Sequence, residues 1–246
     1  MKCQSLVILV CLTFMVVLPT ASMGGVWRDN FDGAKIGSGW EFTNPPKQCK
    51  YEVADGMFSI KLEGKNDIWG GQDNAAKLLR EAPEGNYSVE TRIVIKPDAK
   101  AKTANTWTSI TMFDDAKSPS ANWLYLARGG NSEINIEYAK NNAGNIGPSL
   151  KNMADTELYL KVEKTGQDYT GHYKIKENDK WIKVGTTKHD ALNPSKVGLL
   201  VKSWAVRSMV CNYDYFEMEG ENVKSNMTAV APNGKLAVTW GQLRSH

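Results

Sequence analysis

The chain has 246 residues, 41% hydrophobic and 23% charged, and its 30 basic and 27 acidic side chains leave a formal net charge of +3. This composition is typical of a soluble globular protein with one substantial core, and it excludes a disordered or fibrous chain. No basic run or basic amphipathic stretch occurs, so neither nucleic acid nor a membrane surface is expected as a partner.

The first 24 residues have the pattern of a cleavable signal peptide. Lys2 precedes an apolar run from Leu6 to Leu18, and small residues follow in Pro19-Thr-Ala-Ser22. The run is shorter than the roughly 20 apolar residues that a membrane span needs. We therefore expect an exported, extracellular protein.

Cys49 and Cys211 would remain after cleavage, and the sequence leaves open whether they form a disulfide.

From about residue 25 to residue 220 the chain reads as short strands separated by turns, without a helix. In the clearest case, Leu158, Leu160 and Val162 share one face of a strand that leads through a turn at 165–168 into a second strand. Further strands are expected at 27–31, 40–42, 51–53, 58–62, 75–79, 87–95, 106–113, 122–127, 133–138, 181–185, 197–201 and 210–218, and loops at 64–72 and 141–148. About a dozen short strands indicate an all-β sandwich or barrel, and residues 221–246 are interpreted as a polar tail outside it.

Three of these strands, at 106–113, 122–127 and 133–138, combine a buried face with an aromatic and polar face. We expect the buried set to be Ile110, Met112, Leu124, Leu126, Ile134 and Ile136. The opposite set is then Trp107, Ser109, Thr111, Trp123, Tyr125, Glu133, Asn135 and Glu137, which we call the aromatic face. A register error of one residue would exchange the two faces, in which case the tryptophans would fill the interior.

Landmarks along the chain resemble a known family. They are Asp29-Asn-Phe-Asp-Gly33 with Trp40, Asp55-Gly-Met-Phe-Ser-Ile60, Asn86-Tyr-Ser-Val-Glu-Thr91, Glu157-Leu-Tyr-Leu-Lys-Val-Glu163, Tyr169-Thr-Gly-His-Tyr173, Trp181-Ile-Lys-Val-Gly185, Val197-Gly-Leu199 and Asn212-Tyr-Asp-Tyr-Phe216. In this order they resemble the concanavalin A-like domain at the C-terminus of family 43 β-xylosidases and related stand-alone secreted domains. The resemblance implies a two-sheet jelly roll that handles carbohydrate. The catalytic propeller of the xylosidases is not in this sequence, so we do not expect their activity to transfer.

A carbohydrate site needs aromatic rings on which sugar rings pack and polar groups that bind the hydroxyls. Both kinds occur on the aromatic face and in the loop that carries Trp69. The candidate ligand-binding residues are Trp69, Arg92, Trp107, Trp123, Tyr125, Glu133, Asn135 and Glu137. The expected function is non-catalytic binding of a polysaccharide or glycan by a secreted domain, and a structural or adhesive extracellular protein is an alternative.

A second alternative is a glycoside hydrolase. Glu133-Ile-Asn-Ile-Glu137 resembles the Glu-x-Asp-x-Glu strand of family 16 glucanases, although Asn135 replaces the middle aspartate. Residues four apart on a strand are roughly 13 Å apart. The side chains would therefore have to converge to act as a catalytic pair, and a solvated strand face is the other interpretation.

Relatives of the fold often hold a structural cation between the first and last strands. Asp29, Asp32 and Asp214 stand at the corresponding landmarks. Their carboxylates are suitable ligands for calcium, a hard cation that prefers oxygen. They could equally cap turns.

Overall fold

The computed structural model describes residues 24–44, 47, 49–97, 105–114 and 121–226, which contain strands and no helix. The predicted signal peptide, except Gly24, and residues 227–246 of the predicted tail lie outside this part of the chain. Within it, no helix is long and apolar enough to cross a membrane. The strands are β1 (Gly25–Asp29), β2 (Glu41–Thr43), β3 (Lys50–Ala54), β4 (Met57–Asn66), β5 (Ile68–Trp69), β6 (Gln72–Asp73), β7 (Ala76–Glu81), β8 (Tyr87–Pro97), β9 (Thr106–Phe113), β10 (Trp123–Gly129), β11 (Glu133–Lys140), β12 (Ala143–Lys151), β13 (Glu157–Thr165), β14 (Asp168–Lys174), β15 (Ile182–Lys188) and β16 (Lys196–Gly220).

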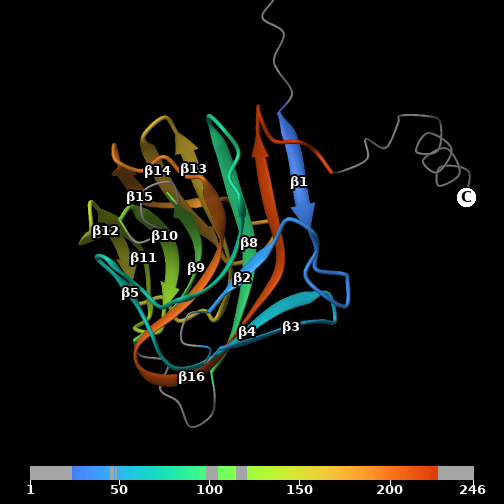
Figure 1. Ribbon diagram of the computed structural model, residues 1–246, viewed down its shortest axis with the longest axis vertical. Helices are drawn as coiled ribbons and strands as arrows, with labels where there is room; N and C mark the ends of the chain where they lie inside the picture. Colours follow the sequence, from blue (N-terminus) through green and yellow to red (C-terminus); the bar gives the residue numbers. More distant parts are fainter. Residues whose placement is uncertain (1–23, 45–46, 48, 98–104, 115–120, 227–246) are drawn as a thin grey trace, which may run out of the picture.

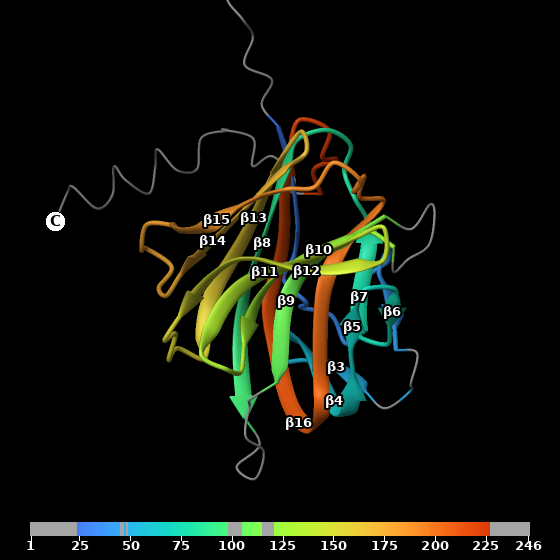
Figure 2. The same ribbon diagram turned by 90° about the vertical axis from the view of Figure 1, so that its left-hand side faces the viewer.

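Hydrogen bonds join fourteen of these strands into one antiparallel sheet that folds into two layers (Figures 1 and 2). The first layer runs β12-β11-β10-β9, then the first half of β16, then β7 and β2. The second layer runs β3-β4, then the second half of β16, then β8-β13-β14-β15, and β1 pairs with the end of β16. This arrangement confirms the predicted all-β, two-layer sandwich.

Strand β16 belongs to both layers because it bends near its middle, at the bottom of Figure 1. Residues 196–203 pair with β7 and β9, whereas residues 207–220 pair with β4, β8 and β1. The register shifts between Ser203 and Arg207 and again between Tyr213 and Phe216. The two strands expected at 197–201 and 210–218 are therefore one bent strand.

The main core lies between the layers, and the predicted alternation of the three central strands is confirmed. Ile110, Met112, Leu124, Leu126, Ile134 and Ile136 all belong to it and are at most 1% exposed. Leu158, Leu160 and Val162 pack into the same core from β13. Full burial of a side chain of this size stabilises a fold by about 1.5–3 kcal/mol. The face of each strand that carries these apolar side chains therefore turns inward.

The prediction of a loop at 141–148 is wrong, because Ala143–Lys151 forms β12 at the edge of the first layer. Asparagine and glycine are poor strand formers, which explains the error, but pairing with β11 outweighs that propensity. The glycines have a packing role here. A Cβ at Gly144 would lie 2.6 Å from the Trp69 ring, so only glycine lets that indole rest on β12.

The two cysteines of the described residues, Cys49 and Cys211, are buried free thiols. Cys49 precedes β3 and Cys211 lies on β16, and β4 lies between these two strands. Burial raises the pKa of the Cys211 thiol to about 12. The reactive thiolate is therefore scarce at neutral pH.

We predict that Cys211 in the folded chain does not react with a thiol reagent at pH 8 and reacts fully once the chain is unfolded in guanidinium. The reason is that its pKa lies far above the working pH while the side chain is buried. Mass spectrometry of alkylated peptides measures both states. A Cys49–Cys211 disulfide peptide from the non-reduced chain would contradict the prediction.

The close approach of β7 and β16 yields a second prediction. A Cβ at Gly198 would overlap the carbonyl oxygen of Leu78, which belongs to the backbone and cannot move aside alone. Gly198→Ala should lower the free energy of unfolding by about 1–3 kcal/mol or more, as overpacking does. Urea denaturation measures the loss. Gly33→Ala, in a surface loop, is the control and should change stability much less.

Candidate functional site

The aromatic face lies on the outer side of the first layer, as the alternation predicted. Cross-strand pairs bring Tyr125 on β10 opposite Thr111 on β9 and Glu137 on β11, and Gly129 opposite Trp107 and Glu133. The rings of Trp123 and Tyr125 are parallel, with centroids 5.3 Å apart. The sequence therefore assigned the face correctly.

The same face is covered, which the sequence did not indicate. The segment Ile68–Asp73, which contains β5 and β6 and which we call the cover hairpin, packs on it and forms a second apolar cluster. Trp123 donates a hydrogen bond from Nε1 to the carbonyl oxygen of Gly70, 3.3 Å away. Trp107, Trp123 and Tyr125 are consequently at most 2% exposed, and the polar members of the aromatic face are at most 7% exposed.

A buried charge network occupies the centre of the covered face. Lys202, 1% exposed, directs Nζ to the Glu137 carboxylate at 3.1 Å and to the carbonyl oxygen of Ile68 at 3.2 Å. Asp67 lies 3.5 Å from the same ammonium group. A buried ammonium is tolerated when it is paired and hydrogen-bonded in this way, and breaking one partner is costly.

Aromatic rings complete the surroundings of Lys202. Its Nζ lies 5.0 Å from the Trp107 ring centroid, 5.1 Å from Tyr125 and 5.6 Å from Trp69. These distances fit cation–π attraction, which strengthens where water is excluded. Burial, and next the Glu137 carboxylate, raise the pKa of Tyr125 well above its ordinary value. The phenol therefore stays protonated and donates a hydrogen bond to Glu137.

Two indoles remain accessible at the surface of this region. Trp69 on the cover hairpin is 40% exposed, and Trp204 on β16 is 51% exposed. Trp204 meets Trp107 edge to face, with centroids 5.1 Å apart. Each exposed ring thus rests on a buried partner, because Trp69 contacts Lys202 and Trp204 contacts Trp107.

The two glutamates of β11 point to different neighbours. Glu133 forms an ion pair with Lys151 of β12, opposite it in the sheet. Glu137 accepts hydrogen bonds from Tyr125, from Asn135 at 2.7 Å and from Lys202. A retaining pair of carboxyls is about 5–5.5 Å apart and an inverting pair about 6.5–9.5 Å. In this structure each of the two carboxylates is engaged by its own set of partners.

Arg92 is not part of this region. It lies on β8 in the second layer, where its guanidinium binds Asp214 at 2.9 Å and also Glu157. Asp214, together with Arg92, Tyr159 and Lys174, lines a polar cavity of about 360 Å³. The structure therefore separates Arg92 from the other seven predicted ligand-binding residues.

Two of the three candidate calcium ligands are engaged by other residues. Asp29 accepts hydrogen bonds from the Phe31 backbone and from Trp40 Nε1, both at 2.8 Å, as a turn-capping residue does. Asp214 forms its ion pair with Arg92. Asp32 follows Phe31 in the turn after β1. Among the described residues, no group of three or more His, Cys, Asp or Glu side chains is placed to hold a metal ion.

Sequence reasoning missed Lys202, Asp67 and Trp204. The signal for two of them was present, because an alternation that begins at Leu200 places residues 202 and 204 on the same face. The predicted strand ends at Val201, one residue short of Lys202. Asp67 carried no comparable signal, since it follows β4 directly and only the path of the chain brings it to Lys202.

The buried network yields a prediction about stability. Lys202→Met should lower the free energy of unfolding by about 3 kcal/mol, because it leaves the Glu137 carboxylate buried without its cation. The double variant Lys202→Met, Glu137→Gln should recover much of that loss. Lys196→Met, which removes a pair with the exposed side chain of Glu81, is the control and should cost less than about 1 kcal/mol. Additive losses in urea denaturation would contradict the coupling.

Comparison with known proteins places this geometry in a family. The family model described as the β-xylosidase C-terminal concanavalin A-like domain matches residues 28–219. A search of curated proteins gave no match. Among solved structures, the xylan β-1,4-xylosidase of Bacillus halodurans C-125 is 15% identical with a TM-score of 0.61, and the GH43 protein BlXynB of Bacillus licheniformis is 17% identical with a TM-score of 0.59. Each alignment covers 78% of this chain and 39% of the other.

A glucanase shares the fold over nearly its whole length. The β-1,3-1,4-glucanase (lichenase) derived from a mouse hindgut metagenome is 13% identical with a TM-score of 0.57, and the alignment covers 79% of this chain and 98% of that one. Identities this low establish the fold alone. The chain spans about two fifths of the length of the xylosidases that it matches. Because the family model covers most of the two-layer sandwich, the chain belongs to the family of β-xylosidase C-terminal concanavalin A-like domains.

Proposed function

We propose that this chain is an exported, non-catalytic carbohydrate-binding domain that holds a polysaccharide against Trp69 and Trp204. The observation that carries the proposal is that two indoles, 40% and 51% exposed, lie over one covered region of the first layer. Indole faces are the surfaces on which the C–H side of a sugar ring packs. The family and the glycoside hydrolases among its structural neighbours support a carbohydrate ligand.

Both rings are held before any ligand arrives. Trp69 packs against Gly144 of β12 and faces the Lys202 ammonium, and Trp204 is braced by Trp107. Such rigid positioning lowers the entropy that binding would otherwise cost. The buried network therefore acts as a support that orients the exposed rings, while the three covered aromatics do not touch ligand themselves.

Exposed indoles on two different strands, β5 and β16, suit an extended ligand chain. Ile146 of β12, paired opposite Glu137, is also exposed beside this region. Apolar contacts spread along a face bind successive sugars of a polymer. Because Glu133 and Glu137 are each bound by other side chains, binding without bond cleavage is the function that we assign.

The proposal is tested by affinity electrophoresis in gels that contain xylan, mixed-linkage β-glucan or xyloglucan. Trp69→Ala and Trp204→Ala should each weaken binding about tenfold, which corresponds to about 1.4 kcal/mol. Trp181→Ala, which changes a tryptophan packed by Lys161 and Lys174 on the second layer, is the matched control and should bind like the unchanged chain.

Three outcomes would contradict the proposal. Folded protein that binds none of a broad panel of polysaccharides would shift the assignment to a structural or adhesive role. Binding that survives both tryptophan substitutions would place the site elsewhere. Release of sugar that stops in Glu133→Gln would instead identify a hydrolase.

A further inference from the structure

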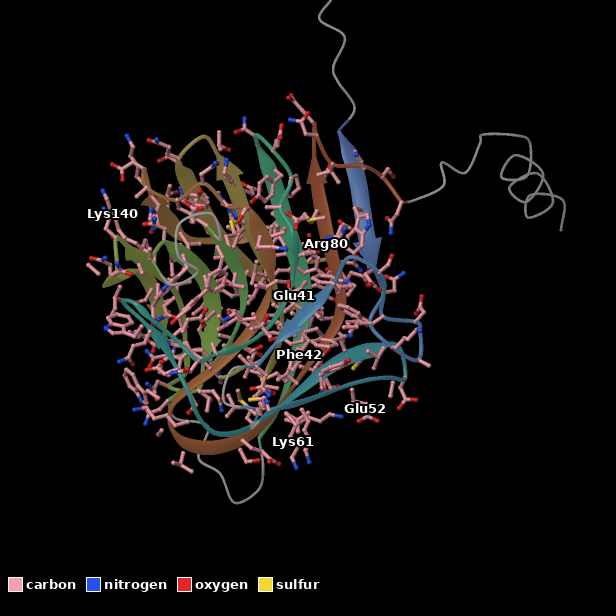
Figure 3. The ribbon with its side chains drawn as sticks, in the orientation of Figure 1. Glu41, Phe42, Glu52, Lys61, Arg80 and Lys140 are labelled. Carbon is pink, nitrogen blue, oxygen red and sulfur yellow. The ribbon has the colours of Figure 1, made fainter. Side chains whose placement is uncertain are left out.

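Arg80 occupies a position where the strand pattern calls for an apolar residue. On β7, Ala76 and Leu78 point into the main core, and alternation places Arg80 on the same side at the end of the strand. Its guanidinium lies over the Trp27 ring at 3.2 Å from the centroid and 5.2 Å from that of Trp40. Figure 3 labels Arg80 close to β1, which carries Trp27.

The guanidinium has ring contacts but no hydrogen-bond partner among the described residues. Its Nε and Nη1 are buried and unsatisfied. Asp29 is near enough to act on Arg80 electrostatically, but its two oxygens bind Phe31 and Trp40 instead. Burial lowers the pKa of Arg80 to about 10, so the side chain remains a cation at neutral pH. Buried polar groups of a folded protein normally have partners, so this residue calls for an explanation.

A cavity of about 700 Å³ lies beside this arginine at the end of the sandwich. It is lined by Trp27, Arg80, Glu84, Met218, Asn222 and Lys224, among others. Glu81 also reaches the cavity, but it is paired with Lys196 at 2.7 Å. The remaining charged residues of the lining are two cations, Arg80 and Lys224, and one anion, Glu84. Their net charge of one positive unit suits an anion that carries a single charge.

We propose that this cavity binds a carboxylate group, with Arg80 as its anchor. A guanidinium presents donors in a planar fork that matches the two oxygens of a carboxylate. The Trp27 and Trp40 rings hold that fork in one orientation, as an aromatic platform under a cation does. The carboxylate belongs either to a free organic acid or to a uronic acid unit of a glycan. The site is independent of Trp69 and Trp204.

The experiment is a titration of the full chain with sodium glucuronate, sodium acetate or glucose at equal ionic strength. Calorimetry measures the binding, and the melting temperature measures the stabilisation. Both carboxylates should bind and raise the melting temperature, because a ligand that binds only the folded state stabilises it, and glucose should do neither. If glucuronate binds at least tenfold more tightly than acetate, the ligand is a sugar acid. Equal affinities identify any small carboxylate.

Two arginine variants test the anchor. Arg80→Met should abolish carboxylate binding, and Arg80→Lys, which keeps a cation without the fork, should weaken it at least tenfold. Arg28→Met is the matched control, because Arg28 also lies over an aromatic ring, Tyr215, but its guanidinium is already paired with Glu217. Arg28→Met should bind carboxylate like the unchanged chain.

A third readout works without relying on a substitution that could impair folding. The Arg80 Nε–H signal in a nitrogen–proton NMR spectrum, assigned by its absence from Arg80→Lys, should shift as glucuronate is added to the unchanged chain. No carboxylate binding by calorimetry with no shift of that signal would overturn the proposal. Unchanged affinity in Arg80→Met would also overturn it. A failure of polysaccharide binding at Trp69 and Trp204 would leave this result unaffected.

Discussion

The architecture depends on strand β16, whose hydrogen bonds hold both layers of the sandwich. Its first half completes the first layer between β7 and β9, and its second half joins β4 to β8 in the second. A bend between Ser203 and Arg207 turns the strand from one layer to the other. The position of this bend decides that Lys202 and Trp204 lie on the outer side of the first layer, next to the aromatic face.

Burial of the aromatic face changes the role of its residues. Tryptophan and tyrosine rings beside glutamate and asparagine have the composition of a sugar site, but the cover hairpin has removed them from water. In that setting a lysine ammonium at 5.0–5.6 Å from three rings stabilises the interior, since cation–π attraction grows as solvent is excluded. The covered aromatic and charged side chains thus position two outer indoles, Trp69 and Trp204. The function that we propose rests on these two indoles.

Lys202 is a buried cation and Arg80 a half-buried one, and their surroundings differ. Lys202 is fully paired, whereas Arg80 is stacked on Trp27 with its Nε and Nη1 lacking a protein partner among the described residues. A paired buried charge stabilises a particular arrangement, while an unpaired one costs free energy and is a marker of binding. This contrast separates the support beneath the outer indoles from the proposed carboxylate site at the end of the sandwich.

The sequence by itself determined the strand content, the fold family and the side to which each central strand turns. Those features depend on the alternation of apolar and polar residues along each strand. Ile110 and Leu126, which the alternation places inward, do lie in the main core. Only the tertiary structure decided that Trp107, Trp123 and Tyr125 are covered, that β12 is a strand, and that Arg92 and Asp214 form a pair far from the aromatic face. Each of these depends on segments distant in the chain, such as Ile68 packing over β10 or Asp214 reaching β8. Alternation within one strand cannot predict such contacts, because it records which face is apolar but not what lies against it.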